Sequence, residues 1–359
     1  MVKRIYPVIS LILLSFILVS WGYKGHYAIN TKCPESFPAS MTAFRVWADS
    51  LNQHGSDADY RKGSDPTEGP KHYLDIENFA EFNTTGRIAS TYDSIVSIHG
   101  AYFMKSNGTL PWATLNMYDS LKLAFKQARW HKAMLHASDL GHYVGDGHMP
   151  LHLTVNYDGR ETGQGGIHSR YESEMLDYYL SPITNYGGDS VHFVSNVNKY
   201  IFDYIYNSHG YVDSVLAADT YATNLAGNNY SALYYQTLWS KTHFTTRLLH
   251  DSSHSLAELI YTAWVEAGSP AFGKQAVLNT LPDTVNKDNV SIYPNPTRGI
   301  LNMMGDEVFK TEVSNIAGVS MGGFYTQQID LKDLPNGMYI LSIYGKNGFL
   351  KKEKVLLAK

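Results

Sequence analysis

The sequence predicts an all-α domain followed by a small all-β sandwich domain. Two observations carry this prediction: long segments of helical period fill the middle of the chain, and short alternating segments separated by Gly, Asn and Pro fill its end. A short apolar run precedes both. We therefore divide the chain into residues 1–20, 21–285 and 286–359. A chain of 359 residues is long enough for two domains with separate cores.

Residues 1–20 have the features of a secretory signal peptide. Two basic residues precede an apolar run from Val8 to Val19, and Ser20 is a small residue at a cleavable position. The run is shorter than the roughly 20 residues that a membrane span needs, so we expect no transmembrane span in the mature chain. Cleavage after Ser20 would make Trp21 the first residue of the mature protein.

Residues 21–285 are predicted to be mainly helical. Leu121–Leu135 and Ser255–Gly268 have apolar residues at helical spacing, and strand-like alternation is scarce in this part of the chain. The stretch Gly55–Pro70 is rich in Gly, Asp and Pro and is predicted to be a loop.

This helical part is acidic and rich in histidine. Residues 21–285 carry 18 basic residues, 26 acidic residues and all 15 histidines. Such a domain is a poor electrostatic match for long duplex DNA, whereas histidine and carboxylate side chains bind cations well. The single cysteine, Cys33, excludes an intrachain disulfide and a CxxC zinc site. Any metal must therefore be held by imidazole and carboxylate groups.

Two pairs of possible metal ligands are spaced four residues apart. His142 and Asp146 would share one face of a helix, and so would His168 and Glu172. A proline ends the first helix, which allows His152 to approach from the turn beyond it. Imidazole and carboxylate are the ligands that zinc accepts when thiolates are absent. The repeated spacing therefore predicts a metal centre.

Residues 286–359 are predicted to form the β-sandwich, with strands such as Met338–Tyr344. This segment resembles the C-terminal sorting domain of the type IX secretion system. The resemblance rests on Tyr293–Gly299, Leu334–Ile340 and the basic tail Lys351–Lys354. It implies export by the type IX secretion machinery, removal of the domain, and a secreted or surface-attached product. An ordinary β accessory module is the alternative.

The middle of the chain resembles the trinuclear zinc phosphodiesterases, which include the bacterial zinc-dependent phospholipases C and the fungal single-strand nucleases. Trp21-Gly-Tyr-Lys-Gly-His26 has the form found at the start of the nuclease branch, and the segment from His142 to Glu172 matches further family ligands in order. The resemblance implies three zinc ions per chain. The implied ligands are Trp21, His26, Asp59, His72, His142, Asp146, His152, His168 and Glu172.

The resemblance also distributes these ligands over three zinc sites. The first site has Asp59, His72, His142 and Asp146, the second has His152, His168 and Glu172, and the third has Trp21, His26 and Asp146. Trp21 would bind through its free α-amine. Asp59 is preferred to Asp57 because the second Asp of Asp-Ala-Asp-Tyr matches the phospholipase branch.

The expected function is that of a secreted, zinc-dependent phosphodiesterase of the phospholipase C type, a hydrolase acting on phosphoric diesters. Zinc lowers the pKa of a bound water to about 7, which supplies hydroxide at neutral pH, and its charge stabilises phosphate oxygens. Asp59 is expected to act as the catalytic residue that orients the hydroxide or takes its proton. Lys62 or its neighbour Arg61 is expected to contact the phosphate, and the protein is expected to be a monomer.

Two branches of the family compete for the substrate. Tyr60 matches one wall of the choline pocket of the phospholipases, although Lys24 and Pro70 replace two other members of that pocket. Tyr73 lies where the nucleases stack a base, and Asp75 matches their base-reading acid. The substrate is thus a phospholipid headgroup or a single-stranded nucleic acid. A single-strand nuclease or 3′-nucleotidase with the same zinc centre is the first alternative, and a non-catalytic metal-binding surface protein is the second.

Overall fold

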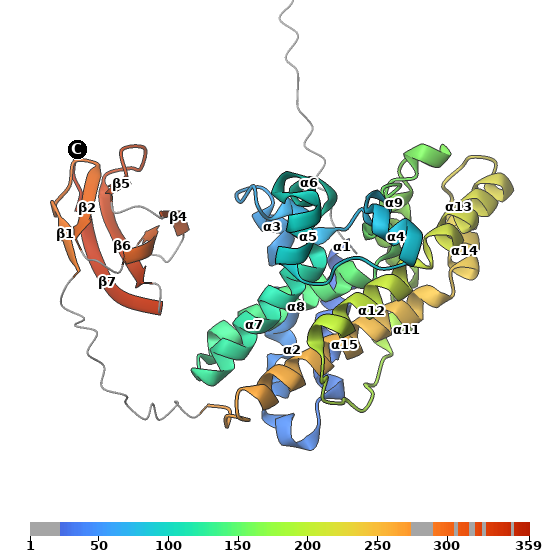
Figure 1. Cartoon of the computed structure of the whole chain (residues 1–359), viewed down its shortest axis with the longest axis horizontal. Coiled ribbons are helices and arrows are strands. Elements are labelled where there is room, and N and C mark those ends of the chain that lie inside the picture. Colours follow the sequence, from blue (N-terminus) through green and yellow to red (C-terminus); the bar gives the residue numbers. More distant parts are fainter. Residues whose placement is uncertain (1–21, 274–289, 305–307, 316–319, 325–327, 346–347) are drawn as a thin grey trace, which may run out of the picture. The chain divides into compact units, whose positions relative to one another are not determined.

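The computed structural model describes residues 22–273, 290–304, 308–315, 320–324, 328–345 and 348–359. The chain divides into two compact units, Met1–Ala276 and Val277–Lys359 (Figure 1). The described part of the first unit is helical and that of the second is β, which confirms the predicted fold class. The predicted signal peptide and the predicted boundaries at 20/21 and 285/286 lie outside the described residues and stay predictions.

The helical unit contains long and very short helices. They are α1 (Gly22–Lys32), α2 (Ala48–Gln53), α3 (Asp57–Arg61), α4 (Ala80–Thr85), α5 (Tyr92–His99), α6 (Ala101–Asn107), α7 (Leu110–Lys126), α8 (Trp130–His148), α9 (Ile167–Ser169), α10 (Met175–Tyr179), α11 (Ser181–Thr184), α12 (Val197–His209), α13 (Val212–Ala226), α14 (Ala232–Lys241) and α15 (Phe244–Glu266). In the part of the chain that the structure describes, none of the helices combines the length and the apolarity that a bilayer crossing requires.

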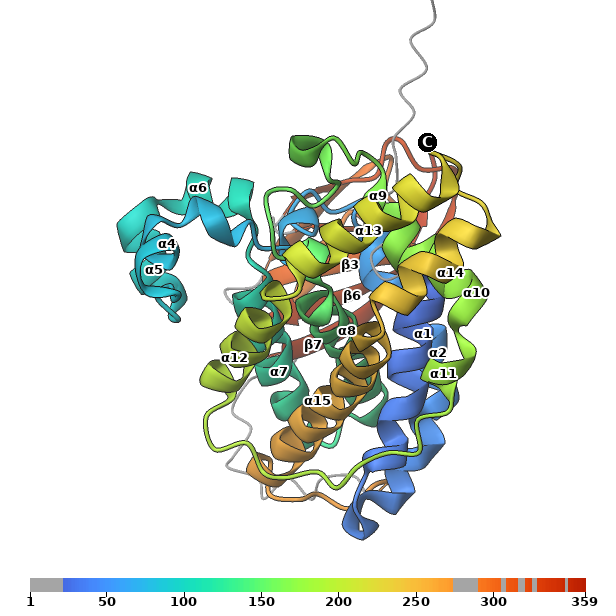
Figure 2. The ribbon, with the colours of Figure 1, turned by 90° about the vertical axis from the view of Figure 1, so that its right-hand side faces the viewer.

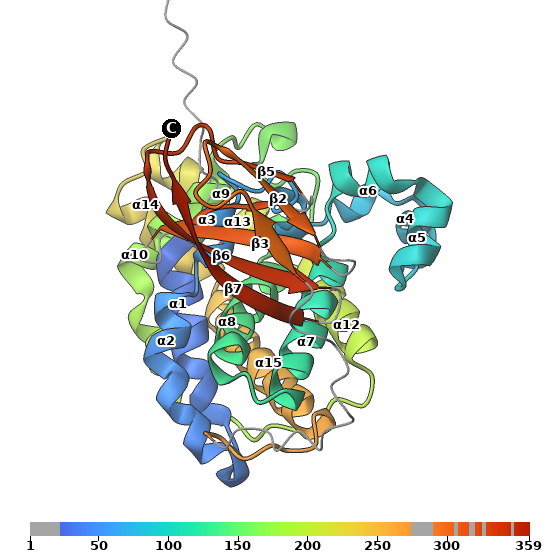
Figure 3. The ribbon, with the colours of Figure 1, turned by 90° about the vertical axis from the view of Figure 1, so that its left-hand side faces the viewer.

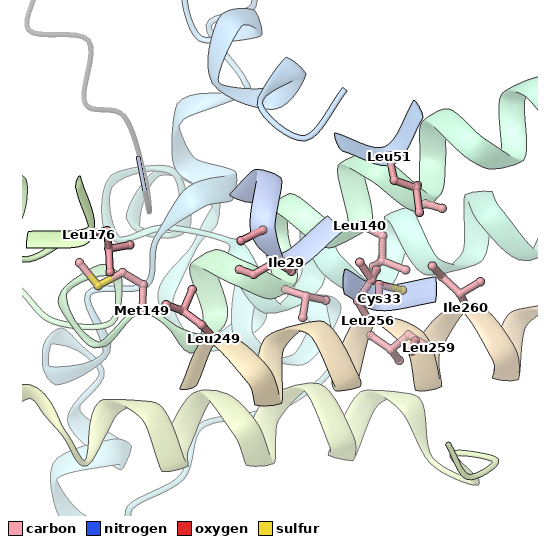
Figure 4. Packing of buried hydrophobic residues seen from close by; sticks show 14 of the residues in the cluster. Ile29, Cys33, Leu51, Leu140, Met149, Leu176, Leu249, Leu256, Leu259 and Ile260 are labelled. Atoms are coloured by element: carbon pink, nitrogen blue, oxygen red, sulfur yellow. The ribbon is translucent and has the colours of Figure 1, made fainter. Parts of the chain in front are cut away.

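The centre of this unit is formed by α8 and α15, with α1 and α7 packed against them. Figure 2 shows α1, α15 and α7 side by side. Ile29 of α1, Leu140 of α8 and Leu256 and Ile260 of α15 are fully buried and meet in one cluster (Figure 4). Full burial of such a side chain contributes about 1.5–3 kcal/mol. The apolar faces that predicted the helices therefore form the core.

Two local predictions are corrected by the structure. The predicted helical segment Leu121–Leu135 contains a break between α7 and α8, where Ala128 takes a φ of 48°. The amide of Arg129 donates to the carbonyl of Ala124 over 2.9 Å, the bond that ends a helix in a Schellman motif. The predicted loop Gly55–Pro70 contains the short helix α3, because no helix-breaking residue lies between Asp57 and Arg61. The segment Ser255–Gly268 begins within α15 and runs to two residues beyond its end.

A smaller part of the helical unit lies at one side, where α4, α5 and α6 are grouped (Figures 2 and 3). A second cluster of buried residues, including Phe79, Ile95 and Met104, forms its core. The segment that leads into it is attached to the main body, because the amide of Leu74 donates to the carbonyl of His152 over 2.8 Å. This contact brings residues from two distant parts of the sequence to one place.

The β unit consists of two antiparallel sheets. Its strands are β1 (Ser291–Tyr293), β2 (Ile300–Met304), β3 (Val308–Asn315), β4 (Ser320–Phe324), β5 (Gln328–Asp330), β6 (Gly337–Gly345) and β7 (Gly348–Leu357). The strand orders are β1-β2-β5 and β4-β3-β6-β7. On β6, Tyr339, Leu341 and Ile343 are buried, as the period-2 pattern of the sequence predicts. They pack with Leu301 and Val355 in a single apolar cluster.

Candidate metal centre

Small residues on α8 allow α1 to approach it closely. A Cβ atom at Gly141 would lie 1.9 Å from Asn30 Oδ1, and one at Gly145 would lie 3.0 Å from His26 Nδ1. Glycine at these positions costs some helix propensity, but it permits close contact between the two helices. The contact places His26 of α1 beside His142 of α8, with their rings stacked at a centroid distance of 3.9 Å.

The first group of possible ligands joins α3, the turn before Tyr73, and α8. His142 Nε2 lies 3.5 Å from Asp59 Oδ1 and 3.0 Å from His72 Nδ1. Asp146 Oδ2 lies 2.9 Å from His72 Nδ1. The members are at most 3 % exposed. The structure therefore brings together the four residues that the sequence assigned to the first site.

The second group shares two residues with the first. Asp146 Oδ1 lies 3.4 Å from His26 Nε2, and His26, His142 and Asp146 together present atoms within 4.8 Å of one another. The predicted partner Trp21 lies outside the described residues. Because the two carboxylate oxygens of Asp146 face different groups, this side chain can bridge two cations.

The third group lies beyond the end of α8. His152 Nε2 and His168 Nε2 lie 3.4 Å and 3.3 Å from the same Glu172 oxygen, Oε2. His152 belongs to the 3₁₀ turn Pro150–His152, and the other two lie on α9 and the π-helical turn that follows it. The two imidazole rings stack at 5.0 Å. The pairs that the sequence placed on common faces therefore do face one another.

The donor atoms of these groups fit a divalent metal ion. The Nδ1 atoms of His142 and His152 donate to backbone carbonyls over 2.9 Å and 2.7 Å, so each neutral ring directs the lone pair of Nε2 at its group. Asp146 Oδ1 and His152 Nε2 are buried and form no hydrogen bond. Buried polar atoms without a hydrogen bond are costly unless a ligand is bound to them. Imidazole and carboxylate together suit zinc.

Mutual interactions control the charge of these buried side chains. Burial alone would lower the pKa of His142, but the carboxylates of Asp146 and Asp59 outweigh it and raise this pKa to about 9. Burial and the neighbouring His142 lower the pKa of His26 to about 4. Burial would raise the pKa of Glu172, but His168 and His152 hold it below its usual value. Without metal, a proton on His142 therefore compensates the neighbouring carboxylates, whereas the His26 ring stays neutral.

A pocket of 370 Å³ opens beside the first and third groups. Its lining includes the candidate ligands His72, His152 and His168, together with Lys62, Tyr73, Asp75 and Tyr157. The Lys62 ammonium lies 2.7 Å from Asp59 Oδ1. The Tyr73 hydroxyl donates to the carbonyl of Ser106 over 3.2 Å, which fixes the ring at the pocket wall. Burial, with help from Glu77 and Glu161, raises the pKa of Asp75 to about 7.

Most of the predicted substrate-binding residues therefore lie near the ligands, but Tyr60 is 60 % exposed and is not part of this pocket's lining. Asp59 belongs to a ligand group, while Asp57 lies 2.7 Å from His54 in a partly exposed pair. Sequence reasoning overlooked Glu68 and Tyr157. Glu68 precedes His72 by four residues, the same spacing as in the other pairs, so this signal was available.

Comparisons with known proteins give three results. Residues 291–357 match the family model described as the secretion system C-terminal sorting domain, which confirms the prediction for this segment. The chain therefore carries a type IX sorting domain, and its destination is the exterior or the cell surface, across the outer membrane. No curated protein sequence matches the chain.

Solved structures resemble the fold. The alpha-toxin of Clostridium absonum has a TM-score of 0.43 at 10 % identity, over 93 % of this chain and 96 % of that one. The Clostridium perfringens alpha-toxin from an avian strain has a TM-score of 0.45 at 11 % identity, over 94 % of each chain. Both scores are below 0.5, so the site residues above are assigned from the geometry of this chain alone.

Proposed function

We propose that the helical unit is a zinc-dependent phosphodiesterase of the phospholipase C type. The observation that carries the proposal is the presence of three buried groups of imidazole and carboxylate atoms, two of which contribute residues to the lining of one pocket. The groups account for the proposed zinc ligands His26, Asp59, His72, His142, Asp146, His152, His168 and Glu172. The α-amine of Trp21 is proposed to complete the site of His26.

Zinc ions bound there would supply a nucleophilic water at neutral pH and positive charge for the phosphate oxygens. Residues of the chain would position the attacking water and bind the phosphate. Asp59 is buried with one oxygen facing Lys62, so it is held where it can orient an attacking water or accept its proton. Lys62 also lines the pocket, where its ammonium would approach the phosphate and stabilise the charge that develops during the displacement.

Three other lining residues of the pocket favour a substrate with a cationic headgroup. Tyr73 and Tyr157 offer aromatic surfaces, and Asp75 lies between acidic neighbours. Among the described residues, the Asp75 carboxylate forms no hydrogen bond and no ion pair. A positively charged ammonium next to the phosphate would be stabilised there by cation–π contacts and by the carboxylate. This favours a zwitterionic phospholipid over a polyanionic strand.

One observation favours the nuclease as the second candidate. Tyr73 and Asp75 line the pocket beside the ligands, while Tyr60, the residue that matched the phospholipases, does not. An aromatic ring and a nearby carboxylic acid can also stack and hydrogen-bond a nucleobase. The two substrates would therefore interact with Asp75 in different ways. A substrate ammonium would be stabilised by the negative charge of the Asp75 carboxylate, whereas a nucleobase would form a hydrogen bond with it.

A direct comparison of turnover tests the proposal. Mature protein would be incubated in zinc buffer with phosphatidylcholine vesicles or with single-stranded DNA at equal phosphodiester concentration. We expect release of phosphorylated headgroup, with a loss of about 10²–10⁴-fold in Asp59→Asn and little change in the matched variant Asp57→Asn. Nucleotide release alone would transfer the assignment to the nuclease. Bound zinc without turnover of either substrate would contradict an enzymatic function and support a metal-binding protein.

A further inference from the structure

One buried carboxylate beside the ligand groups is not explained by metal binding. Glu68 is 1 % exposed and lies one helical turn before His72, at the start of the 3₁₀ turn Gly69–His72. It does not belong to any of the three groups of possible ligands. Removing the charge of a carboxylate from water costs several kcal/mol, so a buried carboxylate needs partners that compensate this cost.

We propose that Glu68 is a positioning residue that holds the His72 ring in the tautomer required for metal binding. This inference rests on the proposed zinc centre. The two nitrogens of the ring face different partners: Nδ1 lies 2.9 Å from Asp146 Oδ2 and 3.0 Å from His142 Nε2, whereas Nε2 lies 3.5 Å from Glu68 Oε1. His72 can therefore bind a metal in its group only through Nδ1.

The tautomer matters because a neutral imidazole has one proton. In the structure described, Nδ1 is in hydrogen-bonding contact with Asp146, which suits a proton on Nδ1. Metal binding at Nδ1 requires a lone pair on that atom, so the proton of the neutral ring must then reside on Nε2. The acceptor that faces Nε2 is the Glu68 carboxylate. A carboxylate opposite the distal nitrogen also makes the ring a more basic ligand.

Glu68 is held in place by groups other than His72. Its Oε1 accepts a hydrogen bond from the Tyr143 hydroxyl, and its Oε2 accepts one from the Lys71 ammonium over 2.8 Å. Arg61 Nε lies 3.5 Å from Oε2, and the same guanidinium donates to Asp139 over 3.0 Å. These donors fix the carboxylate before any metal binds, as a preorganised acceptor must be.

A purely structural role is the competing explanation. The same contacts connect Arg61 and Lys71 to Tyr143 and Asp139 of α8, so Glu68 also joins the ligand-bearing turn to the helix. A structural role predicts lower stability of the metal-free protein. A positioning role predicts weaker binding of the zinc ion that His72 holds, with a smaller effect on the metal-free protein. Zinc affinity and metal-free stability therefore separate the two explanations.

The experiment uses the mature chain with Glu68→Leu, Glu68→Gln and the matched control Glu258→Leu. Glu258 is also a buried carboxylate that contacts histidine and a tyrosine hydroxyl, but it lies outside the ligand groups. Zinc affinity would be measured by competition with a chromophoric chelator, zinc content by elemental analysis, and metal-free stability by urea unfolding. We expect Glu68→Leu to weaken one zinc site by about 10–100-fold.

Glu68→Gln keeps a carbonyl oxygen opposite Nε2, so we expect it to recover a large part of the affinity that Glu68→Leu loses. Glu258→Leu should leave all zinc affinities unchanged. Unchanged zinc affinity in both Glu68 variants would overturn the inference, as would equal weakening in Glu258→Leu. If Glu68→Leu does not fold, Glu68→Gln decides: a neutral amide is a weaker acceptor than a carboxylate, so one zinc site should still bind measurably more weakly than in the wild type, and unchanged affinity would overturn the inference. Wild-type protein that binds zinc without turnover would contradict the proposed function and leave this test intact, while wild-type protein without zinc would contradict both.

Discussion

The interiors of the two units are built on opposite principles. In the described part of the β unit the buried residues are almost all apolar, such as Leu301, Leu341 and Val355, with Thr297 and Thr311 as polar exceptions. The interior of the helical unit contains an apolar core and, beside it, a cluster of fully buried imidazoles and carboxylates such as His142 and Asp146.

The difference shows where the chain gives up stability for function. An apolar interior stabilises in proportion to its area and needs no ligand. Buried charged groups instead lower stability unless protons, partners or metal ions compensate them. In the helical unit the carboxylates of Asp59, Asp146 and Glu172 are compensated by imidazoles when metal is absent. The comparison therefore predicts that the two units respond differently to metal.

Metal removal should have the largest effect. Each bound zinc stabilises the folded state by about 4 kcal/mol when its free concentration is 1,000 times Kd. For a domain of this size, 1 kcal/mol corresponds to about 2–4 °C in Tm, so we expect chelation to lower the Tm of the helical unit by about 10 °C or more. The transition of the β unit should move little. Scanning calorimetry with and without a chelator checks this, and equal shifts of both transitions would contradict the comparison.

A single substitution within the cluster should come next. Asp146→Asn keeps the shape of the side chain but removes the charge that faces His26 and His72. We expect zinc content to fall and turnover to drop by roughly 10³-fold, since several kcal/mol of metal-based stabilisation are lost. Glu258→Gln, a substitution of another buried carboxylate in the same unit, should keep both zinc and turnover. Full zinc content in Asp146→Asn would disprove the bridging role.

Predictions from the sequence succeeded where the relevant contacts are local. A spacing of four residues is enough to place His142 with Asp146, and His168 with Glu172, because a helical turn fixes both members. Period-2 alternation was enough for β6. The sorting domain was also recognisable, because its motifs are short and continuous in the sequence.

Other features depend on contacts that no local pattern reveals. The break after α7 forms at Ala128, a residue without the glycine signal that normally marks a left-handed helix end. Tyr157 reaches the pocket only because the chain after α8 folds back. The partners of Glu68 include Tyr143, 75 residues away. Such pairings follow from tertiary packing and became visible only in the three-dimensional structure.

The smallest expected effect is on the stability of the helical unit at acidic pH. It compares two buried carboxylates of this unit, Glu258 and Asp146. Burial would raise the pKa of Glu258, but hydrogen bonds from His254 and Tyr200 outweigh it and lower this pKa to about 2. Unlike Asp146, for which we propose zinc as a further partner, Glu258 has no proposed ligand and depends on donors of the protein alone. Because the unfolded chain has a glutamate pKa of about 4.3, the folded state binds fewer protons between these two values.

The stability contributed by Glu258 is thus fully present above about pH 4.3 and is lost as the pH falls toward 2. Glu258→Gln should lower the free energy of unfolding at neutral pH by about 1–2 kcal/mol and make it less dependent on pH in that acidic window. Urea unfolding of both proteins would be measured in chelator at several pH values from 2 to 6. The chelator removes zinc beforehand, so the difference between the two curves reports the contribution of Glu258 alone. Parallel pH profiles of the unfolding free energy for wild type and variant would show that Glu258 keeps an ordinary pKa despite its hydrogen-bond donors. The contrast between Glu258 and the carboxylates of the ligand groups would then depend on the proposed metal ions alone.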